Sequence, residues 1–159
     1  RDCLLSRGLG DVYKRQVSEG AEIGPEQEWY KPVLEICQII AQGQYQVKAS
    51  RPLVVDGVEF ICYGILDFLK AGVIYDTKFS RTYHVGKYLD SPQHPMYFYL
   101  CPEVQRFEYI ISDGNYIYRE AYSPEDTVPI ENTVRQFMRW MDKTSLVDLY
   151  CQNWRSRYA

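Results

Sequence analysis

The chain has 159 residues, of which 46% are apolar and 25% are charged, and its formal net charge is −3. This length and composition are those of one globular domain with enough apolar residues to bury a substantial core. The net charge argues against a protein that is basic over its whole surface, but not against an enzyme with basic residues in one groove. No stretch has the length of a membrane span and no signal-peptide pattern is present, so we expect a cytoplasmic protein without a membrane partner.

The first sixteen residues differ from the rest of the chain. Residues 1–16 begin with Arg1 and not Met, are basic and are interrupted by glycine. We expect this segment to be non-native, as a translated adapter or vector read-through is, and the alternative is a short genuine helix. On this interpretation, residues 17–159 form a single domain that is truncated at its N-terminus.

The N-terminal half of this domain predicts a helix followed by three strands. The helical pattern covers 25–42. The helix begins at residue 25 or, because Pro32 interrupts the apolar spacing, near Tyr30. The strands, which are rich in β-branched and aromatic residues, cover 44–55, 59–69 and 73–80. Short glycine-containing turns at 56–57 and 70–72 make consecutive strands antiparallel neighbours.

The C-terminal half predicts a second helix, two strands and two further helices. Ser91 and Pro92 are suited to the start of the second helix, on which Gln93 and Tyr97, four residues apart, share one face. The two strands cover 106–112 and 116–122, and the turn between them covers 113–115. The last two helices cover 129–143 and 146–154. This order of elements indicates an α/β or α+β domain with a mixed sheet flanked by helices.

The turn at 70–72 predicts the register of the central hairpin. Counting outwards from the turn pairs Phe68 with Tyr75 and places Asp67 directly opposite Asp76. Two carboxylates opposite one another repel, so we interpret the pair as a site for a cation. Lys78 projects from the same face as Asp76. Hard oxygen ligands favour Mg²⁺ or Mn²⁺, whereas the simpler alternatives are a solvated Asp67 and a plain Lys78–Asp76 salt bridge.

These residues carry a resemblance to a known family. Gly64-x-x-Asp67, Asp76-x-Lys78 and Gln93-x-x-x-Tyr97, in this order, resemble the motif series of the PD-(D/E)XK nuclease superfamily and, within it, the RecB-type exonuclease branch. That branch includes bacterial recombination exonucleases, CRISPR-adaptation nucleases and phage relatives. The resemblance implies a restriction-endonuclease-like core with a central mixed sheet of about five strands flanked by helices.

The resemblance also implies a catalytic site. Asp67, Asp76 and the backbone carbonyl of Thr77 hold one Mg²⁺ or Mn²⁺ beside the scissile phosphate, and Lys78 orients or deprotonates the attacking water. Gly64, Gln93 and Tyr97 support the site and position the substrate strand. The implied function is a metal-dependent DNA nuclease, of the exonuclease type, in recombination, repair or phage replication.

The sequence departs from the family pattern in two places. Relatives usually add an acidic residue from a helix before the first strand, for which Glu28 and Glu35 are the only nearby candidates, and often a histidine there, which has no match here. Some relatives hold an iron–sulphur cluster with clustered C-terminal cysteines, but Cys151 stands alone. We therefore expect no cluster, and five free cysteines in a reducing compartment.

Two other functions stay open. One is a catalytically silent nuclease fold that binds DNA or acts in assembly, and the other is a small structural partner of recombination or phage proteins. The presence of Asp67, Asp76 and Lys78 together argues against both. The choice between exonuclease and endonuclease, DNA and RNA, the polarity and the oligomeric state are not decided by the sequence.

Overall fold

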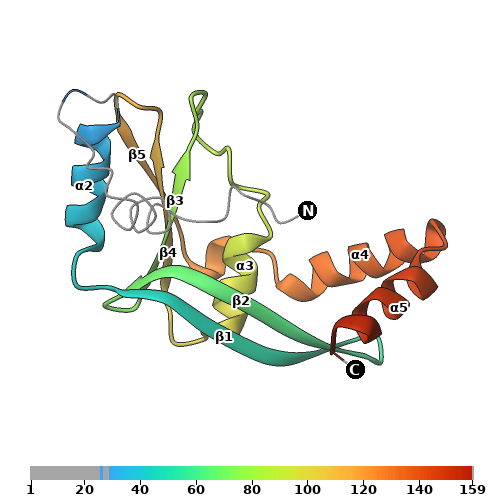
Figure 1. Ribbon diagram of the computed structural model, residues 1–159. Coiled ribbons are helices and arrows are strands. Elements are labelled where there is room, and N and C mark those ends of the chain that lie inside the picture. The colour runs from blue at the N-terminus through green and yellow to red at the C-terminus, as the bar shows by residue number, and fades with distance from the viewer. Residues whose placement is uncertain (1–25, 27–28, 159) are drawn as a thin grey trace.

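Five strands form one open mixed sheet in the order β1-β2-β3-β4-β5 (Figure 1). The structure, a computed structural model, describes residue 26 and residues 29–158. The elements are α2 (Tyr30–Ile40), β1 (Gln44–Val55), β2 (Val58–Lys70), β3 (Val73–Phe79), α3 (Gln93–Leu100), β4 (Arg106–Ser112), β5 (Ile117–Tyr122), a 3-10 turn (Pro124–Asp126), α4 (Ile130–Lys143) and α5 (Val147–Tyr158). The expected α+β fold, a central mixed sheet of five strands flanked by helices, is confirmed.

Neighbouring strands are antiparallel except for β3 and β4, which are parallel. The chain leaves the end of β3, passes through α3 and returns to start β4 beside β3 (Figure 1). This connection is the crossover that parallel neighbours require. It places α3 over the sheet, where the helix packs chiefly against β2 and β1.

The two faces of the sheet are covered by different helices. On β4, Phe107 and Tyr109 pack in one core cluster with Phe98 of α3, whereas Ile110 packs in a second cluster with Ile36 of α2. Because successive side chains of a strand point to opposite faces, α3 and α2 cover opposite sides of β4. The face of a given strand residue can therefore be read from the helix that it meets.

The alternation of faces is broken in the middle of the β1–β2 hairpin. Leu66 packs in the α3 cluster but Phe68 packs in the α2 cluster, and on β1 the same change occurs between Val47 and Tyr45. Gln46 lies between the latter two with a φ of 50°, a rare backbone conformation for a residue other than glycine. This kink in both strands is centred on Gln46 and Asp67, which are also missing from the ladder pairs.

The kink coincides with the point where β2 leaves β3. The β2–β3 ladder contains only Lys70 with Val73, Leu69 with Ile74, and Phe68 with Tyr75. These three pairs confirm the register predicted from the turn. The fourth predicted pair, Asp67 with Asp76, is not formed, because β2 turns away with β1 to make a two-stranded arm beneath α3 (Figure 1).

The predicted elements are correct in type and order, and their ends differ by a few residues. Of the two starts expected for the first helix, the structure has the later one, at Tyr30, with Pro32 in the first turn. The helix expected from Pro92 begins at Gln93, and Ser91 Oγ accepts a bond from the Gln93 N–H at 3.3 Å. The segment 1–16 lies outside the described residues. None of the helices in the described part of the chain is both long and apolar enough to cross a membrane.

Candidate active site

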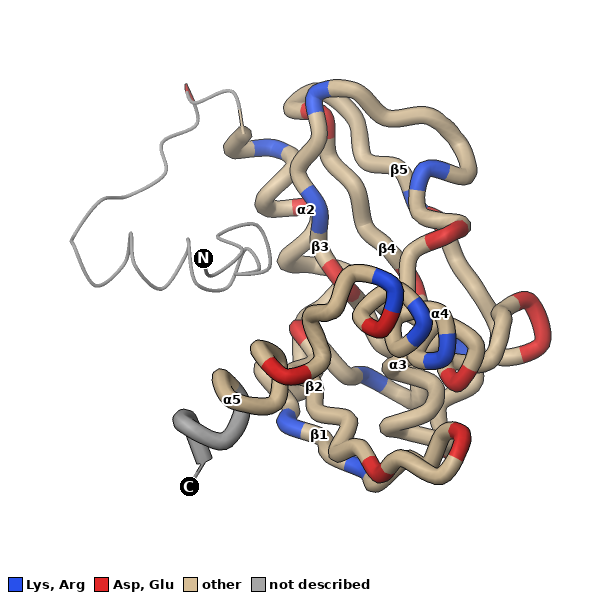
Figure 2. The backbone as a smooth tube through the Cα atoms, turned by 90° about the vertical axis from the view of Figure 1, so that its right-hand side faces the viewer, with Lys and Arg blue, Asp and Glu red and all other residues tan. Residues whose placement is uncertain are grey.

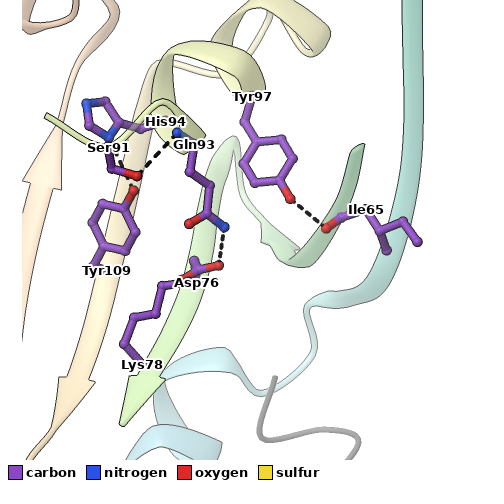
Figure 3. Close-up of polar contacts among 8 residues, drawn as sticks. All are labelled: Ile65, Asp76, Lys78, Ser91, Gln93, His94, Tyr97 and Tyr109. Carbon is purple, nitrogen blue, oxygen red and sulfur yellow. Dashed lines mark hydrogen bonds and ion pairs between the residues drawn. The ribbon is translucent and has the colours of Figure 1, made fainter. Parts of the chain in front are cut away.

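Asp76 is a buried carboxylate on the α3 side of β3. It has the same strand parity as Ile74, which packs in the α3 cluster, and only 3% of its surface is exposed. Gln93 Nε2 donates to Oδ1 at 2.5 Å, and Lys78 Nζ lies 2.7 Å from Oδ2 (Figure 3). Oδ2 nevertheless receives no hydrogen bond of acceptable angle. Every other fully buried side-chain oxygen or nitrogen in the described residues has a hydrogen-bond partner.

The charge of Asp76 is incompletely compensated. Burial raises the pKa of its carboxyl above the ordinary value, and the Lys78 ammonium and the Gln93 amide oppose this rise. The side chain of Lys78 is 20% exposed, so its ammonium is partly shared with solvent. A buried carboxylate with an oxygen free of well-aligned donors favours a further cation at that oxygen.

Lys78 lies between Asp76 and solvent. Its Nζ is 5.9 Å from the ring centroid of Tyr109, which is the β4 partner of Asp76 in the parallel ladder. The aromatic face attracts the ammonium and limits the positions that the long side chain adopts. Lys78 can therefore contact a water or an anion at the Asp76 carboxylate without leaving its present place.

Gln93 and Tyr97 lie one turn apart on α3 and reach two different strands. Gln93 binds Asp76 of β3, whereas Tyr97 Oη donates to the carbonyl of Ile65 on β2 at 2.7 Å (Figure 3). The spacing of four residues puts both side chains on one helix face, as the sequence predicted. Helix α3 thus bridges the two strands at the place where they separate.

Asp67 is buried next to the same tyrosine. It is 8% exposed, and its charge and that of Asp76 both act on Tyr97. Burial, followed by the charge of Asp76 and then that of Asp67, raises the pKa of Tyr97 to about 12, and the Gln93 hydrogen bond opposes this. The phenol therefore stays protonated near neutral pH, and the charges of both carboxylates act on it although Asp67 and Asp76 are not ladder partners.

Gly64 allows β2 to approach α3 closely. A Cβ at this position would lie 2.6 Å from Cε1 of Tyr97 and 2.9 Å from Cδ1 of Leu100. The Tyr97 ring has little room to move, because it is stacked on Phe107 with centroids 5.8 Å apart and its hydroxyl is bound to β2. The role that the structure supports for Gly64 is therefore this close approach of β2 to α3.

We expect Gly64→Ala to lower the free energy of unfolding by about 1–3 kcal/mol, because the added methyl group overpacks the Tyr97 ring. Urea denaturation followed by circular dichroism measures this change. Ser50→Ala on the neighbouring strand, where the side chain is exposed, is the control and should stay within about 0.5 kcal/mol of wild type. Equal urea midpoints for Gly64→Ala and wild type would show that α3 moves to make room for the methyl group with no loss in the free energy of unfolding.

The oxygen atoms of Asp67, Asp76 and Thr77 are ligands of the kind that a hard divalent ion binds. Thr77 follows Asp76 with its side chain on the opposite face, so it can offer the site only its backbone carbonyl. Two carboxylates and a carbonyl are oxygen ligands, and Mg²⁺ and Mn²⁺ accept one or two carboxylates with water in the remaining positions. No group of three His, Cys, Asp or Glu side chains is gathered anywhere in the described residues.

The helical acid expected upstream is not found beside this pair. Glu35 is exposed on α2, whose cluster covers the face of the sheet opposite Asp76. Glu28 lies outside the described residues. The described part of the site therefore consists of Asp67, Asp76 and Lys78, with Gln93 and Tyr97 above them.

Sequence analysis did not assign two residues that support this arrangement. His94 is buried, its Nδ1 lies 3.2 Å from Tyr109 Oη, and its ring stacks on Tyr122 with centroids 4.2 Å apart. Tyr109 in turn lies under Lys78. The only sequence signal was that His94 is next to Gln93, because the parallel pairing of β3 and β4 that brings in Tyr109 is non-local.

His94 should make stability depend on pH. Burial lowers its pKa from 6.5 to about 4, so between these values the unfolded state binds more protons and the free energy of unfolding falls as pH falls. His94→Asn has no group that titrates in this window. We expect the stability of wild type relative to His94→Asn to drop by about 3 kcal/mol from pH 7 to pH 4 in urea titrations. A constant difference would contradict a buried neutral histidine.

A separate apolar groove lies away from Asp76. Its volume is about 990 Å³, and it is formed by the far end of the β1–β2 hairpin together with α4 and α5. Its charged lining residues are Asp56, Glu59, Arg135, Arg139 and Asp142. None of these is buried, and Arg135 is paired with Asp56 at 3.0 Å. The groove lacks a buried carboxylate such as Asp76.

Comparison with known proteins finds a likeness among solved structures. No protein-family model matches the sequence, and no curated protein matches it. A solved structure titled "Crystal structure of SSO0001" aligns with 84% of this chain at 16% identity and a TM-score of 0.48. The alignment covers 64% of that chain, so this chain spans less than two thirds of its length.

Proposed function

We propose that this chain is a metal-dependent nuclease of the PD-(D/E)XK type, related to the RecB branch, that hydrolyses phosphodiester bonds in DNA. The observation that carries the proposal is the Asp76 carboxylate, which is 3% exposed and has one oxygen without a well-aligned donor beside Lys78. The Lys78 ammonium is already paired with this carboxylate, and a metal ion at the same oxygens would add the further positive charge that a deeply buried carboxylate favours.

The arrangement of strands supports this proposal. The order of helix, three antiparallel strands, crossover helix and parallel strand agrees with the core that the sequence motifs imply. Strands β2 and β3 separate one residue before Asp67 and Asp76 would pair. Because the strands separate there, the two carboxylates are not held within a closed ladder, and a ligand between them would not have to break a pair of strands.

Each residue of the site has a defined task in hydrolysis. Asp76 and Asp67, with the Thr77 carbonyl, would hold Mg²⁺ or Mn²⁺, which when bound supplies positive charge to the phosphate and the leaving oxygen. Lys78 holds the attacking water by a hydrogen bond and lowers the energy of the negative charge that builds on the phosphate. Gln93 fixes the orientation of Asp76, and protonated Tyr97 fixes β2 against α3.

The proposal is tested by degradation of linear DNA labelled at one end. Single-stranded and double-stranded substrates are incubated with the protein in Mn²⁺, Mg²⁺ or EDTA, and the products are separated on a denaturing gel. We expect loss of full-length DNA with Mn²⁺ or Mg²⁺ and no loss with EDTA. Mononucleotide products from the first time points support exonuclease action, and a ladder of internal fragments supports endonuclease action.

One observation favours a second candidate function. The described residues contain two carboxylates at the site and no third acidic side chain beside them. A nuclease fold with an incomplete site is the arrangement expected of a catalytically silent module that binds DNA. This alternative predicts DNA binding that is the same in Mn²⁺ and in EDTA, with no cleavage in either.

A further inference from the structure

The loop between β3 and α3 is basic beyond what the proposed mechanism uses. From residue 77 to residue 89 the sequence has no Asp or Glu, but after Lys78 it has Arg81, His84 and Lys87. The whole chain has a net charge of −3, and over the rest of the described fold acidic and basic residues are mixed (Figure 2). Residues 80–89, named here the basic loop, are thus a local positive segment on an acidic protein, and the exposed Asp90 follows them directly.

Both ends of the basic loop lie at the candidate site. At its start the chain leaves β3 after Phe79, the residue that follows Lys78, and Lys78 contacts Asp76. Near its end Tyr88 stacks on Tyr109, the ladder partner of Asp76, with centroids 4.6 Å apart and an angle of 22° between the rings. Burial, followed by the charge of Asp76, raises the pKa of Tyr88, which agrees with this proximity.

The basic loop is anchored to the sheet by Glu120 of β5. Glu120 Oε2 accepts a hydrogen bond from Tyr83 Oη at 2.8 Å, and Oε1 accepts one from the backbone N–H of Tyr88 at 3.3 Å. At the start of the loop, the Ser80 N–H donates to the Ser112 carbonyl at 2.9 Å. The loop is therefore fixed at three places although it has no regular secondary structure.

The basic side chains of this loop are available to a ligand. Arg81, His84 and Lys87 are all exposed. Lys87 Nζ is held over the start of the loop, because it donates to Ser80 Oγ at 2.6 Å and to the Thr82 carbonyl at 2.8 Å. An ammonium fixed in this way loses less conformational entropy when it binds an anion than one on a free side chain.

We propose that the basic loop binds the phosphate backbone of the nucleic-acid strand that enters the Asp76 site, with Arg81 and Lys87 contacting phosphates beside the scissile one. This inference rests on the proposed function. Lys and Arg contacts to phosphates fix the register of a strand without reading its sequence. Because the loop continues directly from Lys78, a strand bound along it passes the buried carboxylate.

The test measures binding without cleavage. A fluorescein-labelled oligo-dT of about 20 nucleotides is titrated with protein in EDTA, and anisotropy is recorded from 50 to 200 mM salt for wild type, Arg81→Gln/Lys87→Gln and Arg139→Gln/Lys143→Gln. The last variant removes the same charge from exposed positions on α4. We expect the loop variant to bind roughly tenfold more weakly at 100 mM salt and the slope of log affinity against log salt to fall by about 1.4.

The salt slope separates a contact from a structural role. If Lys87 only holds the loop together, its replacement lowers the melting temperature and leaves the slope unchanged, so Arg81→Gln alone is measured as well and should reduce the slope by about 0.7. Equal slopes for the loop variants and the α4 control overturn the inference. So does a wild type that does not bind the oligonucleotide.

The two proposals fail in different ways. Wild type that binds the oligonucleotide through the loop but cleaves no DNA in Mn²⁺ contradicts the nuclease proposal and leaves the loop inference intact. Metal-dependent cleavage that is unchanged in Arg81→Gln/Lys87→Gln at limiting DNA concentration supports the nuclease and contradicts the loop inference.

Discussion

Asp76→Asn is expected to reduce the rate of metal-dependent DNA degradation by roughly 1,000-fold or more, because it removes the carboxylate that holds the cation at the phosphate. Asparagine has nearly the same shape and can still accept the Gln93 hydrogen bond at Oδ1. The loss is measured as the initial rate of release of label from linear DNA in Mn²⁺ at saturating substrate.

The variant should fold at least as well as wild type. Burial raises the pKa of Asp76, so above the ordinary carboxyl pKa the charge at this position destabilises the folded state relative to the unfolded one. We therefore expect no decrease in melting temperature for Asp76→Asn in EDTA. Asp142→Asn on α4, where the side chain is exposed, is the matched control and should cleave as wild type does. Cleavage by Asp76→Asn at the wild-type rate would remove Asp76 from the mechanism.

Lys78→Met is expected to reduce the rate of cleavage by roughly 100-fold or more and to leave metal binding intact. Methionine keeps much of the aliphatic length over the Tyr109 ring but has no ammonium to hold a water or to face the phosphate charge. Removing the ammonium that lies 2.7 Å from Asp76 Oδ2 also removes a competitor for that oxygen, so Mn²⁺ should bind no more weakly than in wild type.

The separation between rate and binding distinguishes this role from a structural one. The turnover number and the Mn²⁺ dissociation constant are measured on the same preparation of Lys78→Met. Lys143→Met, at the exposed end of α4, is the control for loss of one positive charge. A Lys78→Met enzyme with an unchanged rate, or one that loses Mn²⁺ together with its activity, would contradict a role for Lys78 at the water and the phosphate.

The hairpin shows what local sequence determines in this fold. Ala71 and Gly72 at its tip have φ values of 51° and 76°, the left-handed conformations of a two-residue turn, and this turn fixes the register of the first three pairs. Counting residues was sufficient up to Phe68 and Tyr75. The next pair could not be predicted, because Gln46 has no sequence signal for its positive φ and the contact between Gly64 and Tyr97 depends on packing across the sheet.

In the candidate site, too, local sequence determines some features and packing between distant segments determines the others. The four-residue spacing of Gln93 and Tyr97 predicted one helix face, and the structure confirms it. The partners of these two side chains follow from where the crossover places α3. Gln93 binds Asp76 of β3, and Tyr97 binds the carbonyl of Ile65 on β2. Tyr109 was not predicted to lie under Lys78, because no local pattern indicates that β4 pairs with β3 in parallel.

Calorimetric titration of Mn²⁺ into wild type and Asp76→Asn, in the absence of DNA, tests most directly whether the buried carboxylate is a cation site. We predict saturable binding of one ion per wild-type chain, and loss of that binding in Asp76→Asn while Asp142→Asn binds as wild type does. No binding by wild type, or equal binding by wild type and Asp76→Asn, would contradict the assignment of Asp76 as a metal ligand and with it the proposed nuclease mechanism.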